Sequence, residues 1–317
     1  MKKVSVVICT YNGERYLREQ LDSILAQTYP VFEVVVQDDC STDGTVGIIE
    51  SYSNKFSNLR IIRNEHNLGF NENFHRALLQ AEGDLIAISD QDDVWDKEKI
   101  ARQVECIGDC NLCCSAYSEG TTQSTPTKIL MPETNIERLM FSNTIPGHTM
   151  LLKREFIRRI EWNNFINYDW WIAVCAALEN NIVCVNQPLN WHRKHEMSAI
   201  ELLRKKYLPT GGKKRKAYQP YLYGAAALKQ LKQKESWKYL YSYIESHSPE
   251  ERNSVAHKLA NLLQRTDASA LLQLCFCCLW NRKKIYPGAS LQKSPVLLLR
   301  SFFYSFIFAY RNTNFES

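Results

Sequence analysis

Four short apolar runs rich in β-branched residues recur along the first third of the chain, with helical patterns between them. The runs are VSVVIC at 4–9, FEVVVQ at 32–37, LRIIR at 59–63 and DLIAIS at 84–89. Runs of this kind are typical of strands that are buried on both faces. Their alternation with helical segments predicts a mostly parallel sheet flanked by helices, and therefore an α/β protein.

Helices are expected between these strands. Leu17, Leu21 and Ile24 recur at helical spacing after the first run, and Asn12 is positioned to act as the N-cap of that helix. Asp43 lies in a cluster of turn-forming residues after the second run and is expected to cap the next helix. The strand and helix signals therefore alternate in the order that a parallel sheet requires.

The chain is expected to contain two parts. Strand and helix patterns continue through residues 1–203, whereas residues 219–317 read as helical. Residues 204–218 combine Gly, Pro and seven basic residues, which predicts a linker. The apolar stretch 295–310 is shorter than the roughly 18 residues that a membrane span requires and is interrupted by Arg300. Two alternatives stay open for it: a helix that lies on a membrane surface, or a helical subdomain that packs on itself.

The composition fits a folded protein of the cytoplasm. Hydrophobic residues make up 45% of the chain, charged residues 23%, and the formal net charge is +5. This charge is too small for a dedicated nucleic-acid binder. Most of the eleven cysteines lie in apolar runs and predict buried thiols, and the cluster 106–114 lacks the second ligand pair of a zinc site. No secretory signal is evident, so contact with a membrane is expected only at the inner face of the cell membrane.

Two groups of carboxylates follow strands at the same edge of the predicted sheet. Asp38 and Asp39 follow the second strand, and Asp90, Asp92 and Asp93 follow the fourth, in the segment SDQDD. Ligands of such sheets bind beyond the carboxyl ends of the strands. Crowded carboxylates repel unless they are solvated, cap backbone amides or face a cation, and Mg²⁺ or Mn²⁺ is the cation typically held by carboxylates and phosphate oxygens. Asp93 is alternatively expected to cap the next helix.

Several longer motifs resemble those of a known family. The segments VSVVICTYNGERYLREQLDSILAQT, EVVVQDDCSTDGT and GDLIAISDQDDVW occur in this order. Together they resemble the family 2 glycosyltransferases, whose fold is called GT-A. SDQDDVW and the later segment NYDWWIA look most like the bacterial rhamnosyltransferase branch. The resemblance covers roughly residues 3 to 200 and implies a nucleotide-sugar-binding domain followed by a C-terminal helical region.

The resemblance implies a role for each matching residue. Asp169 matches the catalytic base, although a helix cap before two core tryptophans is its plain structural alternative. The implied nucleotide-sugar contacts are Thr10, Tyr11, Asn12, Glu14, Asp39, Asp90 and Arg193. The implied ligands of Mg²⁺ or Mn²⁺ are Asp92 and His195. The implied acceptor contacts are Gly147, His148, Trp170 and Trp171.

Two positions depart from the pattern of the family. Cys40 replaces a Gly that permits a positive φ, so the turn must either take a negative φ or be strained. Glu196 replaces the Gly that usually follows the residue at position 195. The motif Gln-x-x-Arg-Trp of processive synthases is absent from the sequence, which predicts addition of a single sugar.

The expected function is that of an inverting glycosyltransferase. It would transfer one sugar, rhamnose from dTDP-rhamnose by the branch resemblance, to a hydroxyl of a surface polysaccharide or a lipid-linked glycan precursor. The alternative is a catalytically silent nucleotide-sugar-binding scaffold in a glycan assembly complex, which the departures at Cys40 and Glu196 motivate. Nucleic-acid binding is disfavoured, because aromatic residues do not interleave with the lysines of the linker.

Overall fold

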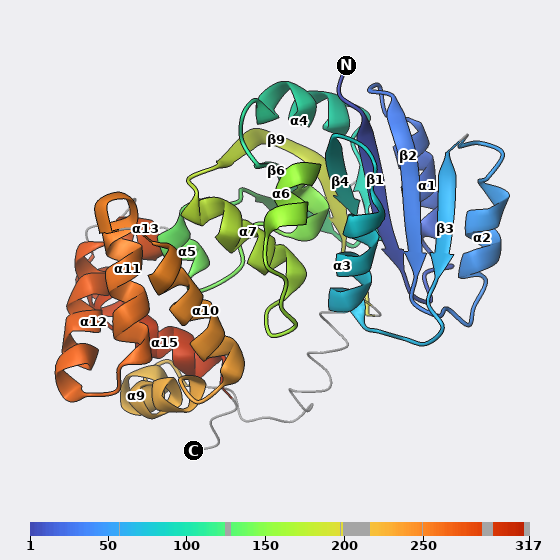
Figure 1. Ribbon diagram of the computed structural model, residues 1–317. Helices are drawn as coiled ribbons and strands as arrows, with labels where there is room; N and C mark the ends of the chain where they lie inside the picture. The colour runs from blue at the N-terminus through green and yellow to red at the C-terminus, as the bar shows by residue number, and fades with distance from the viewer. Residues whose placement is uncertain are drawn as a thin grey trace. The chain divides into compact units, whose positions relative to one another are not determined.

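The structure is a computed structural model that describes residues 1–56, 58–123, 128–196, 198, 216–248, 250–286 and 294–313. The chain divides into two compact units (Figure 1). Unit 1 comprises Met1–Thr134 and Thr144–Tyr207, and unit 2 comprises Asn135–Asn143 and Leu208–Ser317. Most of the predicted linker, 204–218, lies outside the described residues.

Unit 1 is built on a nine-stranded sheet with the order β3-β2-β1-β4-β8-β6-β9-β5, and β7 pairs with β6. The strands β3, β2, β1 and β4 run parallel, whereas β8 pairs antiparallel with β4. The strand bounds are β1 Val4–Thr10, β2 Val31–Asp38, β3 Leu59–Arg63, β4 Leu85–Ser89, β5 Val94–Trp95, β6 Leu112–Gly120, β7 Lys128–Leu130, β8 Leu151–Lys153 and β9 Ile182–Arg193. The four strands predicted first are therefore confirmed, and their carboxyl ends lie at one edge.

Helices cover both faces of this sheet, with α3 in front of it and α1 behind it in Figure 1. The bounds of the helices in unit 1 are α1 Leu17–Leu25, α2 Thr45–Ser51, α3 Phe70–Gln80, α4 Lys99–Ile107, the 3₁₀ helix η1 Gly147–Thr149, α6 Arg154–Arg159 and α7 Tyr168–Leu178. The sheet and its helices confirm the α/β prediction.

The two helix caps predicted from the sequence differ in the structure. The N-cap of α2 is Gly44 and not Asp43, although Oδ1 of Asp43 accepts a hydrogen bond from the backbone N–H of Thr45 at 3.0 Å. The prediction that Asn12 caps α1 is wrong, since the helix begins at Leu17 and Asn12 has a φ of 47°. The left-handed backbone at Asn12 instead turns the chain at the carboxyl end of β1.

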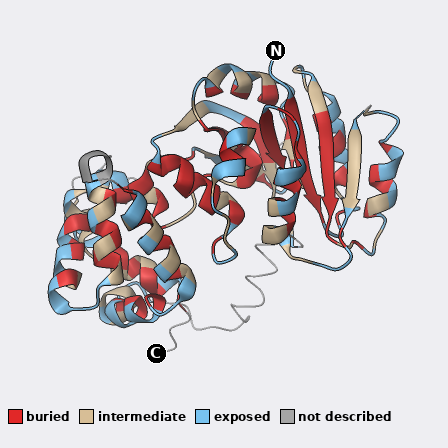
Figure 2. Cartoon of the chain, viewed as in Figure 1, coloured by how far each residue is buried: buried red, intermediate tan, exposed pale blue. Residues whose placement is uncertain are grey.

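The core of unit 1 lies between the sheet and its helices, as the buried residues of β1 and β2 show in Figure 2. Val6 and Ile8 of β1 belong to the same hydrophobic cluster as Leu17 and Leu21 of α1. Every residue of β1 is buried. This burial explains the continuous apolar run in the sequence, because a central parallel strand has no face exposed to water.

Unit 2 is helical. Its helices are α5 Ile136–Leu139, α9 Gln219–Leu231, α10 Glu235–His247, α11 Glu250–Gln264, α12 Ala268–Trp280, α13 Arg282–Ile285, α14 Pro295–Phe302 and α15 Tyr304–Arg311. The sequence pattern did not predict that α5 belongs here. Lys284 pairs with Glu137 at 2.8 Å, and the Tyr241 hydroxyl donates to the carbonyl of Met140 at 2.6 Å. Within the described parts of the chain, no helix is long and apolar enough to cross a bilayer.

Candidate active site

Hydrogen bonds join the loops that follow β1 and β4 at the carboxyl edge of the sheet. The side chain of Gln91 accepts from the backbone N–H of Tyr11 at 2.9 Å and donates to the carbonyl of Tyr11 at 3.1 Å. A Cβ atom added at Gly13 would lie 2.2 Å from Oε1 of Gln91, so Gly13 leaves the space for this amide. Sequence reasoning missed both residues, although Gln91 is the middle residue of the Asp-x-Asp segment.

The loop after β1 is also joined to the loop after β2. The side-chain oxygen of Asn12 accepts from the backbone N–H of Thr42 at 2.9 Å, and Glu14 accepts from that of Gly44 at 2.7 Å. The Thr10 hydroxyl donates to buried Asp38 at 2.8 Å, and Thr10 is itself buried. Tyr11 is exposed. Asn12 and Glu14 are exposed as well, but their side chains, like that of Thr10, are bonded to neighbouring segments, whereas the ring of Tyr11 is exposed.

Asp39 holds a third loop at the same edge. Its Oδ1 accepts from the Asn64 amide at 2.8 Å and from the backbone N–H of Leu68 at 2.7 Å, and its Oδ2 accepts from that of Gly69 at 2.9 Å. A carboxylate offers about four lone-pair sites, so one acceptor site is left. Asp39 is buried, fixes the segment 64–69 beside the edge and has one acceptor site left.

Cys40 adopts a φ of 66°, in the left-handed region that favours glycine. Of the two outcomes expected for this replacement, the strained turn is the one that occurs. Burial of the neighbouring Asp38 and its bond from the Ser41 amide at 2.9 Å keep the chain in this conformation. The loop therefore has the backbone conformation expected for glycine, although a cysteine adopts this conformation only with strain.

The segment SDQDD faces the end of β9. Oδ2 of Asp92 lies 2.7 Å from Nε2 of His195, and Nε of Arg193 donates to the carbonyl of Asp92 at 3.1 Å. The guanidinium of Arg193 lies over the rings of Tyr16 and Trp191, at 4.4 and 4.6 Å from their centres. Three residues predicted for the nucleotide sugar and the metal are thus brought together from segments about one hundred positions apart.

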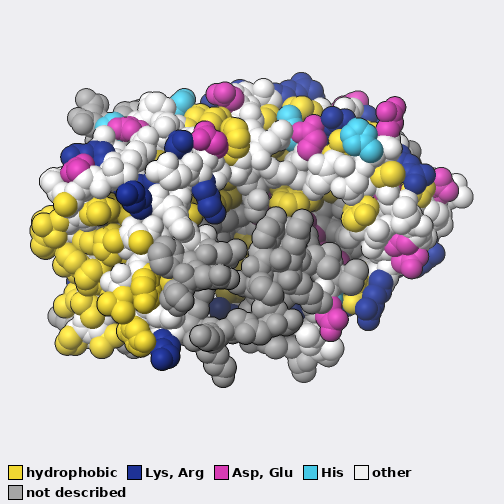
Figure 3. Space-filling model, turned by 90° about the horizontal axis from the view of Figure 1, so that it is seen from below, with side chains coloured by type: hydrophobic (Ala, Val, Ile, Leu, Met, Phe, Trp, Pro, Cys, Tyr) yellow, Lys and Arg dark blue, Asp and Glu magenta, His cyan; other side chains and the backbone are white. Residues whose placement is uncertain are grey.

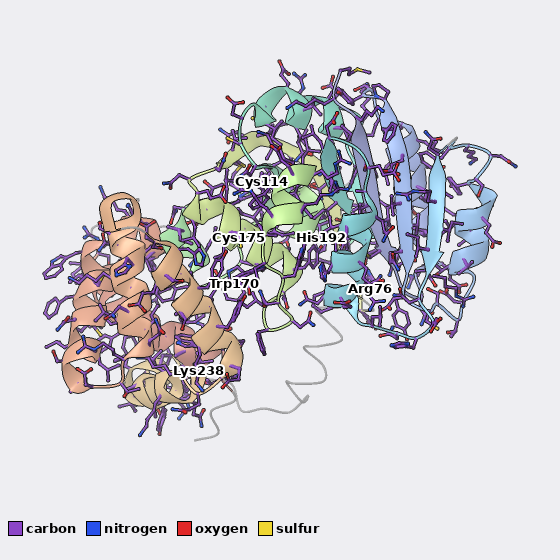
Figure 4. The ribbon with its side chains drawn as sticks, in the orientation of Figure 1. Arg76, Cys114, Trp170, Cys175, His192 and Lys238 are labelled. Carbon is purple, nitrogen blue, oxygen red and sulfur yellow. The ribbon has the colours of Figure 1, made fainter. Side chains whose placement is uncertain are left out.

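Asp93 is buried beneath this segment and does not cap α4, whose N-cap is Glu98, so that prediction is wrong. Its Oδ1 lies 2.9 Å from Nδ1 of His192, labelled in Figure 4, and its Oδ2 lies 3.5 Å from Nδ1 of His148. The two imidazole rings stack with their centres 4.9 Å apart. A single buried carboxylate therefore holds two histidines from different elements.

The protonation of these histidines differs because their partners differ. Burial lowers the pKa of His148 to about 3, and its Nδ1 accepts from the Asn190 amide at 2.7 Å, so this imidazole is neutral. Burial also opposes a charge on His192, but the hydrogen bond and the charge of Asp93 outweigh it and raise the pKa of His192. Burial would raise the pKa of Asp93, yet the hydrogen bond and the charge of His192 lower it. Asp93 and His192 thus form an ion pair in which the carboxylate is buried and the imidazole half-buried.

Two of the predicted acceptor contacts are enclosed by the protein. His148 is 4% exposed and belongs to the network of Asp93. Trp171 is 0% exposed, and its indole N–H donates to the carbonyl of Glu161 at 2.6 Å. The structure argues against an acceptor contact by either side chain. Trp170, labelled on α7 in Figure 4, is half-buried and keeps an accessible part.

Asp169 lies in the first turn of α7, where its Oδ2 accepts from the backbone N–H of Gly147 at 3.3 Å and its Oδ1 from that of Trp170 at 2.7 Å. A Cβ atom at Gly147 would lie 2.1 Å from the hydroxyl of Tyr168, so only glycine fits there. The pKa of Asp90 is raised mainly by burial and the charges of Asp93 and Asp92, and the charge of Asp169 adds to this rise. Asp169 therefore shares the electrostatic environment of the segment SDQDD.

The site suits a divalent cation. Burial, followed by the charges of Asp93 and Asp92, raises the pKa of Asp90 well above its usual range, and a cation would relieve this repulsion. Ligand atoms of four side chains lie within 4.8 Å of one another: Asp90, Asp93, His148 and His192. Two of these four already form the ion pair. The outer pair, Asp92 and His195, offers a carboxylate and an imidazole whose Nδ1 has no hydrogen-bond partner among the described residues.

Comparisons with known proteins agree with this geometry. Residues 5–161 match the family described as Glycosyl transferase family 2. A putative teichuronic acid biosynthesis glycosyltransferase, TuaG of Bacillus subtilis, is 32% identical over 166 residues, which cover 51% of this chain and 66% of that protein. The dTDP-rhamnosyl transferase RfbG of Shigella flexneri is 29% identical over 215 residues, covering 61% and 73%. For the first two curated relatives that it matches, the chain spans 66% and 59% of their length, which is less than two thirds.

A solved structure shares the fold. The mannosyltransferase PcManGT from Pyrobaculum calidifontis, in complex with GDP-Man and Mn²⁺, superposes with a TM-score of 0.54 over 98% of this chain and 86% of that chain, at 17% identity. At this identity the likeness concerns the fold alone. It confirms the expected GT-A architecture with a helical region after it.

Proposed function

Because this chain belongs to glycosyl transferase family 2 through residues 5–161, we propose that it transfers a single sugar, with inversion, from a nucleotide sugar to an acceptor hydroxyl. The observation that carries the proposal is the contact between Asp92 and His195 at 2.7 Å. These two residues lie at the edge of the sheet where hydrogen bonds join the loops after β1, β2 and β4. Parallel α/β sheets bind their ligands at this edge.

Donor binding is assigned to this edge. Tyr11 offers an exposed ring and Asp39 one remaining acceptor site for the nucleoside. Asp92 and His195 would hold Mg²⁺ or Mn²⁺, with Asp90 beside them. Such an ion, when bound, neutralises the negative charge that develops on the departing diphosphate. The guanidinium of Arg193 lies over two aromatic rings and pairs with Glu19, and it would turn to the diphosphate when the donor binds.

Asp169 is proposed as the general base. Its carboxylate would take the proton of the acceptor hydroxyl while the hydroxyl oxygen forms a bond to the anomeric carbon and the bond from that carbon to the diphosphate breaks. The N–H groups of Gly147 and Trp170 hold the carboxylate in one orientation, which limits the loss of entropy in the transition state. Trp170, which is half-buried, would contact the acceptor sugar with its accessible part.

The donor and the acceptor follow from the relatives. RfbG is named a dTDP-rhamnosyl transferase, which supports dTDP-rhamnose as the donor. TuaG is named for teichuronic acid biosynthesis, which supports a surface polysaccharide or a lipid-linked glycan precursor as the acceptor. For the location of the enzyme we propose the cytoplasm, with peripheral contact at the inner face of the cell membrane.

A thermal-shift screen of nucleotide sugars tests the proposal. A donor present at about a hundred times its dissociation constant stabilises the folded state by roughly 2.7 kcal/mol. We expect dTDP-rhamnose with Mn²⁺ to raise the midpoint of unfolding more than the other donors, and EDTA to remove the effect. A larger shift with another nucleotide sugar would replace the donor. The absence of a shift with every donor would contradict nucleotide-sugar binding.

A further inference from the structure

Unit 2 carries exposed apolar side chains on three helices. Leu272, Phe276 and Trp280 of α12 recur at four-residue spacing, which places them on one side of the helix, and Trp280 is 72% exposed. Figure 3 shows hydrophobic side chains gathered at its left, where Figure 1 places the helices of unit 2. We call the following set the apolar face: Leu222, Leu272, Phe276, Trp280, Val296, Leu298 and Leu299.

Aromatic contacts make this surface continuous. The ring of Phe276 stacks on Trp280 at 5.3 Å between centres and meets Phe302 of α14 edge-on at 5.2 Å. Phe302 contacts Phe303 at 5.0 Å, and Phe303 contacts Tyr221 of α9 at 5.4 Å. The exposed residues of α12, α14 and α9 therefore border one aromatic row. Single exposed apolar side chains are ordinary, but a contiguous group across three helices indicates a binding surface.

The helices next to the apolar face are basic. The residues of α12, α13 and α14 include Arg282, Lys283, Lys284 and Arg300 and no Asp or Glu, and Asp267, the N-cap of α12, is paired with Arg265. Lys283 follows Trp280 by three positions and is exposed, and Arg300 is exposed at the end of α14. Lys284 is already paired with Glu137. A partner of this surface must therefore combine an apolar layer with negative charge.

We propose that the apolar face binds the surface of a lipid bilayer that contains anionic lipids. Its aromatic and aliphatic side chains would enter the boundary between headgroups and acyl chains, and Lys283 and Arg300 would meet lipid phosphates. A second copy of the chain fits less well, because pairing this face with itself would bring positive charges together without compensating anions. The proposal is independent of the catalytic assignment, since it concerns unit 2 alone.

Vesicle co-sedimentation of the full chain tests it. The vesicles contain either phosphatidylcholine alone or equal parts of phosphatidylcholine and phosphatidylglycerol, at low and high salt. We expect the anionic vesicles to bind the protein at least about tenfold more tightly at low salt, with the difference reduced at high salt. Wild-type protein that stays in the supernatant with both vesicles, or binds them equally, would overturn the proposal.

Paired variants locate the surface. Trp280→Gln with Leu299→Gln should weaken binding to anionic vesicles by about tenfold, because both side chains lose buried apolar area. Leu25→Gln with Leu79→Gln, at exposed sites of unit 1, is the matched control and should leave binding unchanged. Lys283→Gln with Arg300→Gln should remove the preference for phosphatidylglycerol. An equal loss of vesicle binding in the control variant would overturn the assignment. The assignment would also be overturned if light scattering shows that the wild type is a dimer and that Trp280→Gln with Leu299→Gln makes it a monomer.

Discussion

The carboxyl edge of the sheet in unit 1 and the outer helices of unit 2 use their side chains in opposite ways. At the edge, polar groups of one loop are bonded to another loop, as Gln91 is to Tyr11 and Asp39 is to Gly69. On the apolar face, exposed side chains such as Trp280 present apolar surface and few hydrogen-bonding groups. Loops joined by hydrogen bonds hold a few reactive atoms in place before the substrate binds, whereas an apolar face contributes through the surface area that it buries. Chemistry should therefore depend on single atoms of unit 1, and association on the summed surface of unit 2.

Asp92→Asn should produce the largest effect in this comparison. It leaves the size and the loop unchanged but removes the charge that faces His195, and metal-assisted charge stabilisation is worth several kcal/mol. Transfer should fall about a thousandfold, while binding to vesicles through unit 2 stays the same. Initial rates at saturating donor and Mn²⁺ measure the effect. Asp109→Asn, an exposed carboxylate elsewhere in unit 1, is the control. A rate within a factor of two of the wild type would place the metal elsewhere.

Asp169→Asn should separate donor binding from transfer. The amide keeps the size and can still accept through its oxygen, but it no longer takes a proton, and general base catalysis contributes about 10²–10⁴-fold. The donor dissociation constant, measured by calorimetry, should change little while transfer falls by at least about a hundredfold. Glu161→Gln and Glu179→Gln serve as controls. If either of these abolishes transfer while Asp169→Asn retains it, the base is misassigned.

Asp93→Asn should lower stability more than the other substitutions at the edge. It removes the buried charge that pairs with His192, and breaking a buried ion pair costs about 3 kcal/mol or more. The midpoint of urea unfolding should fall clearly below that of Asp109→Asn. An unchanged midpoint would show that the network of Asp93 and its two histidines does not hold the edge together.

The smallest effect is expected at Cys40, which has a φ of 66°. Cys40→Gly relieves strain of about 1 kcal/mol but increases the entropy of the unfolded chain, so stability should rise by no more than about 1 kcal/mol. Cys40→Val should lower stability, because a β-branched side chain resists this conformation. Cys110→Gly, at a position without positive φ, should destabilise. If Cys40→Gly destabilises as much as Cys110→Gly, the turn is not strained.

The sequence predicted the strands of unit 1 well because periodicity depends on local burial. The run 59–63 coincides with β3, and 32–37 lies within β2. Asp92 and His195 were paired by resemblance to a family, and their contact follows from β9 ending beside the segment SDQDD. Local pattern therefore identified the strands, and known motifs identified the partners across the site.

What the sequence could not show depends on contacts between distant segments. Asp93 appeared to be a helix cap because a carboxylate before a helix often is one, but its partner His192 lies 99 positions away. Gln91 gave no signal, since an amide that fastens two loops has no periodicity. Trp171 appeared able to meet a sugar, yet its indole lies in the core. In each case contacts with distant segments determined the role of the residue, and its neighbours in the sequence did not indicate that role.

Release of nucleoside diphosphate from the donor by the wild-type protein tests the central claim most directly. The protein is first treated with EDTA, and then Mn²⁺ is added back in excess, with dTDP-rhamnose and other nucleotide sugars as donors. The account predicts release that stops with EDTA and resumes with Mn²⁺ in the wild type, but does not resume in Asp92→Asn. Release that continues undiminished in EDTA would contradict the metal site. A donor that binds but is never turned over, with acceptor glycans present, would instead favour a silent scaffold.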